Sequence, residues 1–282
     1  SKDKAYIIRS STTTSSPLKD CYNLMITSAQ NPKFKLIRAL QGRAKTRRKE
    51  NAFLVEGVRL LEEAVVAKWP IRFVLYDRTL SSRGEKLLES IRETIYDIEE
   101  TDSALLKSVS DTENSQGILA VLDFFELPIP DSPDFLLILD QIRDPGNLGT
   151  LLRTAAATGV DAVILPPETA DAFAPKVLRS GMGAHFHIPI LSTSWDDIKE
   201  QVAGLGVYLA VMAGDVAYTE ADFRSPCALV IGGEAEGASP YARNLATTSV
   251  HIPMPGEMES LNAAVAGAVL LFEVVRQRNL VG

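Results

Sequence analysis

The stretch that decides the fold reads HIPMPGEMESLN and spans residues 251–262. A short apolar run precedes it, and an alanine-rich segment with apolar residues at helical spacing follows it. Two earlier turns lie in the same setting, between a buried strand and a helix, and read DPGNLG (residues 144–149) and IGGEAEG (residues 231–237). Glycine, proline and asparagine mark such connections because they allow the backbone geometries that tight turns need. The second half of the chain therefore contains three marked strand-to-helix turns.

Around these turns, near-continuous apolar strands alternate with helices. We expect strands at residues 135–139, 162–165, 188–190, 207–211, 228–231 and 250–252. Helices are expected to begin at Asn147, Ala174, Trp195, Pro240 and Ser260. This pattern predicts an α/β domain with a mostly parallel sheet that is covered on both faces. Ligands bind beyond the carboxyl ends of strands in such sheets, and all three turns are expected there.

The first half of the chain has shorter alternating elements of its own. Strands are expected at residues 53–55, 71–76 and 118–122, and helices near residues 34–40, 60–65, 85–95 and 103–107. This order predicts a small α/β sandwich. The segment ELPIPDSP (residues 126–133) contains three prolines, which stop both a helix and a central strand. We therefore predict an N-terminal domain at residues 25–126, a linker at residues 127–133 and a C-terminal domain at residues 134–282.

Charge is distributed unevenly along the chain. The whole sequence carries a net charge of −7, but residues 1–57 carry a net +8. Eight basic residues and no acidic residue lie in one short segment: Lys33, Lys35, Arg38, Arg43, Lys45, Arg47, Arg48 and Lys49. A cluster of this kind is either a solvated helix face or a surface that contacts nucleic-acid phosphates, since screening limits electrostatic influence to roughly 8 Å. Beside three site-forming turns, we favour contact with nucleic-acid phosphates.

Several other classes of protein are excluded or disfavoured. The two cysteines, Cys21 and Cys227, form neither a disulfide framework nor a metal-ligand cluster, so we expect a reducing compartment, the cytoplasm. No apolar run is long enough to span a membrane. Residues 1–24 are rich in serine and threonine and are expected to be a disordered extension, with the remnant of an organellar targeting segment as the alternative. His185 and His187 fall on one side of an expected strand, but a third ligand is missing, and we predict no metal site.

The three turns resemble the motifs of the SpoU/TrmH family of RNA ribose methyltransferases, within the knotted SPOUT class. The segment DPGNLGTLLRTA (residues 144–155) matches the first motif of the family without a departure. The resemblance implies catalytic roles for Asn147, Arg153, Glu234, Ser260 and Asn262. It implies S-adenosyl-L-methionine as the cofactor, with contacts from Gly232, Gly233, Gly237, Ile252, Met254 and Leu261. It also implies a deep trefoil knot in the C-terminal domain and a homodimer formed through that domain.

The N-terminal half resembles the substrate-binding domain of the same family, which is related to a ribosomal-protein fold. The similar segments are residues 26–33, 52–57 and 109–120. The resemblance implies that this domain selects a structured RNA, since such RNA is read through its shape, its phosphates and its 2′-hydroxyls. Large-subunit ribosomal RNA is the favoured substrate, and tRNA is the alternative. A second alternative is an RNA-binding or ribosome-assembly protein that keeps the fold and does not catalyse.

The implied reaction transfers a methyl group from the sulfonium of the cofactor to a ribose 2′-hydroxyl. Without the resemblance, Asn147 and Ser260 would be explained as helix caps and Arg153 as a solvated surface residue. The first motif contains no histidine, and we do not assign its one carboxylate, Asp144, as a ready base. A guanidinium loses its proton only above about pH 12, so Arg153 is better suited to stabilise developing oxygen charge and to fix a neighbouring phosphate. Whether it also acts as the base stays open at this point.

Overall fold

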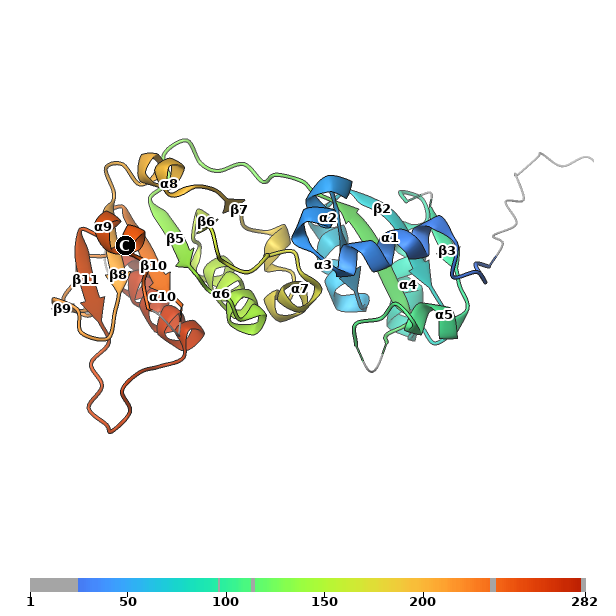
Figure 1. Cartoon of the computed structure of the whole chain (residues 1–282). Coiled ribbons are helices and arrows are strands. Elements are labelled where there is room, and N and C mark those ends of the chain that lie inside the picture. Colours follow the sequence, from blue (N-terminus) through green and yellow to red (C-terminus); the bar gives the residue numbers. More distant parts are fainter. Residues whose placement is uncertain (1–24, 96, 113–114, 234–236, 280–282) are drawn as a thin grey trace, which may run out of the picture.

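Figure 1 shows the computed structural model of the chain, which describes residues 25–95, 97–112, 115–233 and 237–279. The described part contains two separate sheets, one in each half of the chain, with helices packed on them. Residues 1–24, predicted as a disordered extension, lie outside the described residues. None of the described helices combines the length and the apolar character that crossing a membrane would need.

The N-terminal half forms a four-stranded sheet with the order β1-β4-β2-β3. Strand β4 runs antiparallel to β1 and β2, and β3 runs parallel to β2. The strands are β1 (Ala52–Glu56), β2 (Ile71–Tyr76), β3 (Ile98–Glu100) and β4 (Ile118–Asp123). The helices are α1 (Pro32–Gln41), α2 (Ala44–Glu50), α3 (Val58–Val66), α4 (Ser82–Ile91) and α5 (Ser103–Lys107). Strand β3 was not predicted, because three residues are too short a run for a periodicity to be read.

Both faces of this sheet are apolar and both are covered. Successive side chains of a strand point to opposite faces, so Phe53 and Leu54 belong to different cores. Phe53 packs with the apolar residues of α3 and α4, and Leu54 packs with those of α1 and α5. The helix predicted near residues 34–40 is α1, and the basic run continues in a second helix, α2, which begins after Gly42 and Arg43.

The C-terminal half forms a seven-stranded sheet with the order β7-β6-β5-β10-β8-β11-β9. Every neighbouring pair is parallel, which confirms the predicted mostly parallel sheet. The strands are β5 (Phe135–Asp140), β6 (Ala162–Leu165), β7 (Ile190–Ser192), β8 (Gly206–Ala210), β9 (Val216–Ala217), β10 (Cys227–Gly232) and β11 (Thr248–His251). The helices are α6 (Pro145–Thr158), α7 (Pro175–Gly181), α8 (Trp195–Gln201), α9 (Pro240–Leu245) and α10 (Ala263–Asn279).

Helices on both faces bury the apolar strands of this sheet. The core on one face contains Leu151 of α6 and Leu271 of α10, and the core on the other contains Ile198 of α8 and Ala242 of α9. Helix α6 lies between α7 and α10 (Figure 1), and a glycine sits at each close approach. A Cβ atom on Gly149 would overlap with Ser180 of α7, and one on Gly267 would overlap with the side chain of Leu151.

The strand predicted at residues 188–190, directly after the histidine pair, begins too early in the prediction. His185 and Phe186 lie in a short 3-10 helix, η1 (Ala184–Phe186), and β7 begins only at Ile190. The left-handed backbone at Met182 and Gly183, with φ of 49° and 93°, bends the chain before this point. An apolar run with alternating histidines fits a strand by its period, but such short runs are ambiguous from periodicity alone.

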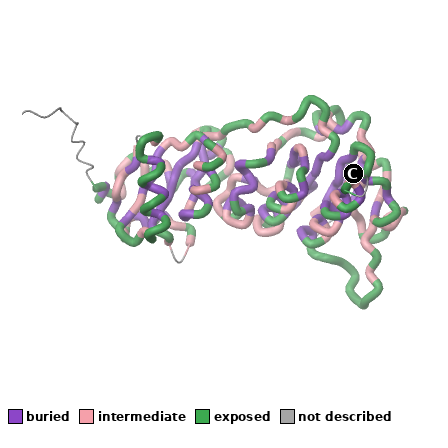
Figure 2. The backbone as a smooth tube through the Cα atoms, turned by 180° about the vertical axis from the view of Figure 1, so that it is seen from behind, coloured by how far each residue is buried: buried purple, intermediate pink, exposed green. Residues whose placement is uncertain are grey.

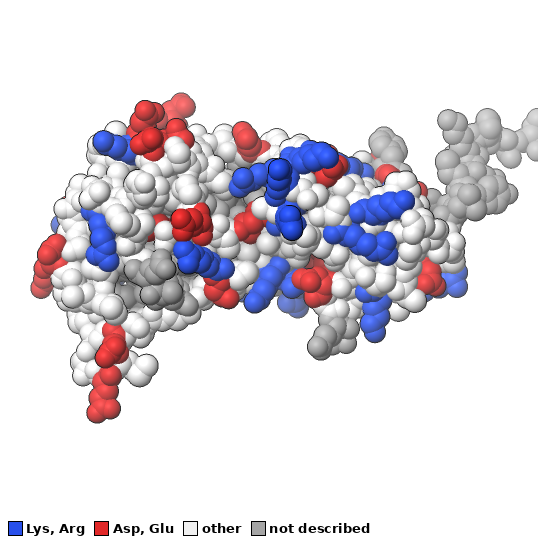
Figure 3. Space-filling view, viewed as in Figure 1, with Lys and Arg blue, Asp and Glu red and all other residues white. Residues whose placement is uncertain are grey.

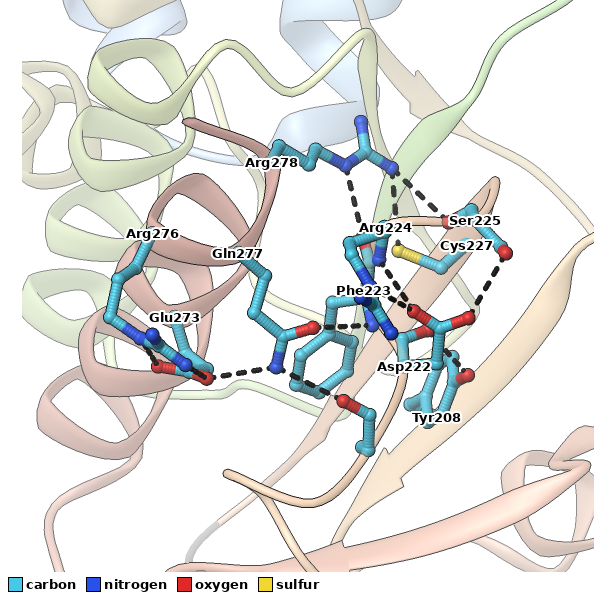
Figure 4. Close-up of polar contacts among 11 residues, drawn as sticks. Tyr208, Asp222, Phe223, Arg224, Ser225, Cys227, Glu273, Arg276, Gln277 and Arg278 are labelled. Atoms are coloured by element: carbon cyan, nitrogen blue, oxygen red, sulfur yellow. Dashed lines mark hydrogen bonds and ion pairs between the residues drawn. The ribbon is translucent and has the colours of Figure 1, made fainter. Parts of the chain in front are cut away.

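The C-terminal end of α10 is fastened to the segment before β10 (Figure 4). Gln277 is 8% exposed, and its Oε1 accepts a hydrogen bond from the N–H of Phe223 at 2.9 Å. Its Nε2 donates to the carbonyl of Ala221 at 3.0 Å and to Glu273 at 2.8 Å. Arg278 donates to the carbonyl of Phe223 at 3.1 Å. These contacts fix the end of the helix that begins at the third turn.

We expect the Gln277→Ala variant to lose about 3 kcal/mol of unfolding free energy, because it leaves a buried N–H and a buried carbonyl without their partners. Urea denaturation of the variant and the wild type would measure this loss. Asn279→Ala, an exposed change in the same last turn of α10, is the matched control and should unfold at nearly the wild-type midpoint. Equal midpoints for Gln277→Ala and Asn279→Ala would contradict the fastening role.

Candidate functional site

The first turn places Asn147 inside a helix and not at its cap. Helix α6 begins at Pro145, and the side chain of Asp144 accepts a hydrogen bond from the N–H of Asn147 at 2.8 Å. The prediction that Asn147 caps this helix is therefore wrong. The N-cap is Asp144, whose side chain accepts from the N–H three residues further on, as N-cap side chains do. Asn147 uses its side chain elsewhere: its Oδ1 accepts from Nδ2 of Asn262 at 3.0 Å.

The third turn ends at Asn262, which caps the last helix. Helix α10 begins at Ala263, three residues after the predicted start at Ser260. The Oδ1 of Asn262 accepts from the N–H groups of Ala264 at 2.9 Å and Val265 at 3.2 Å. Asparagine is among the best N-cap residues, which explains why the helix starts after it. The same side chain therefore caps α10 and joins the third turn to the first.

The backbone of the second turn closely approaches the segment that leads from β5 to the first turn. A Cβ atom on Gly233 would lie 2.5 Å from the carbonyl oxygen of Gln141, the residue after β5. A Cβ atom on Gly232 would lie 2.9 Å from the backbone nitrogen of Ala238. Gly233 also pairs with Gly237, which has a left-handed φ of 67°. Only glycine allows the close approaches at Gly232 and Gly233, so these two residues, predicted to contact the cofactor, are also required by local packing.

Asp140 is part of this site, although sequence analysis did not select it. It ends β5, it is fully buried, and its Oδ2 accepts from the N–H of Ser239 at 2.6 Å. Burial raises the pKa of Asp140, since a carboxylate loses hydration there. The Oγ of Ser239 in turn caps α9. The sequence contained one signal for Asp140. It is an acidic residue at the end of an otherwise apolar strand, the strand that precedes the first turn.

The other predicted site residues lie nearer the surface. Arg153 has an exposed side chain on α6, six residues after Asn147 and thus about 9 Å further along the helix axis. Ser260 and Leu261 lie in the segment from β11 to α10, which extends from the body (Figure 1) and is mostly exposed (Figure 2). Ile252 packs against the main core of this half, and Met254 is half-buried. Glu234 lies outside the described residues.

The predicted basic cluster divides into two groups. Figure 3 shows lysine and arginine side chains over the part of the surface that holds α1 and α2. Six members are exposed there: Lys35, Arg38, Arg43, Lys45, Arg48 and Lys49. Lys33 is held by Asp97 and Glu99, and Arg47 is 3% exposed and bound to Asp171. Burial and carboxylate partners keep Arg47 from phosphates, so it is removed from the RNA-contacting set, and Lys33 is a weak member of it.

The two histidines that were considered as metal ligands have separate partners. The Nε2 of His185 lies 2.8 Å from the carbonyl oxygen of Ala172, and the Nε2 of His187 lies 3.2 Å from Glu63. Within the described part of the chain, no three His, Cys, Asp or Glu side chains are grouped so that they could hold a metal ion. Burial lowers the pKa of His185 to about 4, because the charged ring would lose its hydration.

Stability should therefore fall as the pH drops from 7 to 5. Below pH 6.5 the unfolded chain protonates His185 and the folded protein does not, so about 2 kcal/mol of unfolding free energy is lost through this group by pH 5. Chemical denaturation at both pH values would measure the loss. His185→Gln should show a weaker pH dependence, whereas His187→Gln, at an exposed position, should keep the wild-type dependence. Parallel profiles for all three proteins would contradict this assignment.

Two known protein families match the chain, one in the half that contains the four-stranded sheet and the other in the half that contains the seven-stranded sheet. Residues 134–272 match the SpoU rRNA Methylase family, and residues 31–120 match the MRM3-like substrate binding domain. The 23S rRNA (guanosine(2553)-2′-O)-methyltransferase RlmP of Bacillus subtilis is 36% identical to the chain, over 88% of the chain and 98% of RlmP. A 23S rRNA (uridine(2479)-2′-O)-methyltransferase of Streptomyces viridochromogenes is 34% identical, over 89% of the chain and 92% of that enzyme.

Solved structures of similar proteins extend over both halves of the chain. The SpoU methyltransferase AviRb of Streptomyces viridochromogenes, in complex with the cofactor AdoMet, has a TM-score of 0.80 and 32% identity, over 89% of this chain and 99% of AviRb. The AdoMet-bound rRNA methyltransferase of Sinorhizobium meliloti has a TM-score of 0.79 and 30% identity, over 90% of this chain and 97% of that protein. The similarity therefore includes the arrangement of the two sheets as well as each sheet by itself.

Proposed function

The chain belongs to the SpoU rRNA methylase family, and from this membership we propose that it transfers a methyl group from S-adenosyl-L-methionine to a ribose 2′-hydroxyl of large-subunit ribosomal RNA. The observation that carries the proposal is the junction of the three turns. Asn147 and Asn262 join the first turn to the third at 3.0 Å, and Gly233 allows the second turn to approach Gln141, between β5 and the first turn. The relatives named for 23S rRNA favour ribosomal RNA over tRNA as the substrate. These two relatives are bacterial enzymes named for ribosomal RNA, and this supports the cytoplasm as the proposed compartment.

The second and third turns fit the proposed cofactor. Gly232, Gly233 and Gly237 carry no side chain, so an adenine ring could lie close to the backbone of this turn. Ile252 is partly buried and Leu261 is 38% exposed, so both can offer apolar contact to a ring. When it is bound, S-adenosyl-L-methionine supplies the activated methyl group and the leaving group.

The chain itself has to place and activate the acceptor oxygen. We assign Asn147 and Asn262 to positioning of the acceptor ribose, since their mutual hydrogen bond fixes the orientation of both carboxamides. We assign Arg153 to the phosphate beside that ribose and to the negative charge that develops on the 2′-oxygen. Ser260, in the exposed segment before α10, is assigned to the same ribose. Glu234 keeps the role that the family resemblance implies for it.

We propose that the N-terminal domain (residues 25–126) binds the RNA, with residues 127–133 as the linker to the methyltransferase domain (residues 134–282). Its match to a substrate-binding domain supports this division. The six exposed cations of α1 and α2 and the turn between them would contact phosphates, which supply most of the sequence-independent affinity for a nucleic acid. We propose that the covered four-stranded sheet of this half forms the α/β sandwich expected from the sequence, and it would present that basic surface.

The outer face of α10 supports a homodimer through the C-terminal domain. Val265 is 49% exposed and Phe272 is 54% exposed, and Met258 in the preceding segment is 72% exposed. Large apolar side chains on one exposed face mark an interaction surface. Light scattering at micromolar concentration would test the dimer.

We also propose the trefoil knot for this domain. Strand β10 is inserted between β5 and β8, and α10 then returns over β10 to pack on α6.

Two measurements test the proposed reaction. Calorimetric titration with S-adenosylhomocysteine should give one saturable site per chain, which Leu261→Asp combined with Asn262→Ala should remove. Incubation with radiolabelled S-adenosyl-L-methionine and an unmodified 23S rRNA transcript should then label the RNA, and mass spectrometry of nuclease fragments should locate a 2′-O-methyl ribose. A folded protein that binds S-adenosylhomocysteine but labels neither 23S rRNA nor tRNA would instead be a non-catalytic RNA-binding member of the family.

A further inference from the structure

Arg47 connects the two halves of the molecule. Its Nη1 donates to the carbonyl oxygens of Leu40 at 2.6 Å and Gly42 at 2.9 Å, where α1 ends. Its Nε donates to Oδ2 of Asp171 at 2.7 Å, and its Nη2 lies 2.5 Å from the same oxygen. Asp171 belongs to the C-terminal half and precedes α7. A single buried guanidinium therefore holds the helices of the basic surface against the methyltransferase half.

Further contacts lie at the same junction. Asp111 of the N-terminal half forms an ion pair with Arg179 of α7 at 2.7 Å. The ring of Phe53 in β1 lies 4.9 Å from the ring of Phe173, and Leu178 of α7 is buried in the core of the N-terminal half. Domains within one chain move relative to each other unless their interface is large and apolar. Here ion pairs and a shared apolar core both restrict that motion.

Helix α7 also contacts the first turn (residues 144–149). The Oγ of Ser180 donates to the carbonyl oxygen of Pro145, the first residue of α6, at 3.1 Å. Gly149 of α6 allows the two helices to approach so closely that a Cβ atom there would overlap with Ser180. Asn147 lies between these two contact points in the sequence. The junction at Asp171 and Arg179 is thus one helix away from the proposed acceptor site.

We propose that Arg47 is a positioning residue for methyl transfer, which with Asp171 holds the basic surface of α1 and α2 at a fixed orientation to α7 and to the first turn. The inference rests on the proposed function, since it concerns which ribose reaches the site. RNA is held at the basic surface, and methyl transfer requires an in-line approach that an error of about 1 Å disrupts. The orientation of that surface therefore decides whether bound RNA is reactive. Arg47 acts through Asp171 and does not touch RNA.

The test uses the full-length protein and separates orientation from RNA contact. Asp171→Ala removes the partner of Arg47 and keeps every exposed cation, so its affinity for the 23S rRNA transcript and the salt dependence of that affinity should stay within about twofold of wild type. Its kcat at saturating RNA should fall on the order of 10- to 100-fold. Arg48→Ala, the exposed neighbour, should instead weaken RNA binding and reduce its salt slope by about one.

A charge exchange provides the rescue. Asp111→Arg and Arg179→Asp should each lower kcat, and the double variant should restore most of it, because the partly exposed pair can form in reverse. If Arg47 and Asp171 contribute only to stability, Asp171→Ala would lower the melting temperature and S-adenosylhomocysteine binding together. The molecules of the variant that remain folded would then have a normal kcat. That result, or a wild-type kcat for Asp171→Ala, would overturn the proposal.

Failure of the proposed function is distinguishable from failure of this inference. If the wild type binds no S-adenosylhomocysteine or transfers no methyl group, the reaction itself is wrong. In that event small-angle X-ray scattering still tests the junction, because Asp171→Ala should enlarge the radius of gyration relative to the wild type and to Arg48→Ala. If Asp171→Ala does not fold, the Asp111 and Arg179 variants, which change a more exposed pair, decide the matter by their kcat and their rescue.

Discussion

Replacing Arg153 with alanine is expected to lower kcat for methyl transfer by about 100-fold or more, while affinity for S-adenosylhomocysteine stays within about threefold. The side chain of Arg153 is exposed on α6, so its removal leaves no buried group unpaired, and the fold should be unchanged. The expected loss therefore reports the charge that the guanidinium brings to the phosphate and to the 2′-oxygen. Single-turnover assays with excess enzyme would measure it without interference from RNA affinity.

Two further variants sharpen the assignment of Arg153. Arg143→Ala removes another exposed arginine next to the first turn, one that pairs with Glu168 at 2.9 Å, and should keep nearly normal turnover. Arg153→Lys keeps the charge and loses the planar guanidinium, so it should retain part of the activity if charge stabilisation is the main role. Turnover of Arg153→Ala close to that of Arg143→Ala would remove Arg153 from the catalytic set.

The sequence predicted the parallel sheet because its strands are long apolar runs between glycine- and proline-marked turns. The same patterns left the helix starts less certain. Asp144 and Asn147 are both good cap residues, and only the position of Pro145 decides between them, since proline is favoured in the first helical position. At the third turn, Ser260 and Asn262 compete in the same way, and the structure selects Asn262. The spacing of residue types therefore located the turns, and the side-chain contacts then showed which residues of the first and third turns cap the helices.

Burial of charged residues could not be predicted from these patterns. Arg47 and Arg48 are adjacent in a run of basic residues, and a helix turns by about 100° between them, so one side chain is buried while the next is exposed. Which of the two faces the protein depends on Asp171, which lies 124 residues away in the sequence. Asp140 was missed for a related reason, because its partner Ser239 belongs to a distant helix cap. Cofactor identity came from the motif resemblance, since no periodicity specifies a ligand.

The second large effect is expected from Gly233→Ala, which should weaken S-adenosylhomocysteine binding by about 10- to 100-fold. The new Cβ atom would lie 2.5 Å from the carbonyl oxygen of Gln141, a backbone atom that cannot rotate away as a side chain would. One turn has to move, and overpacking of this kind costs about 1–3 kcal/mol, which corresponds to the stated loss when the displaced turn is the binding surface. Calorimetric titration would give the affinity directly.

Gly256→Ala is the matched control for this loss. Gly256 lies in the segment between β11 and α10, no atom lies within 4 Å of the position of its Cβ, and its φ is outside the left-handed region. The control should therefore bind S-adenosylhomocysteine as the wild type does. Thermal melting of both variants would show whether they remain folded at the titration temperature. If folded Gly233→Ala binds as tightly as Gly256→Ala, the second turn is a packing device between β5 and β10, and the cofactor pocket must lie elsewhere along the carboxyl edge of the sheet.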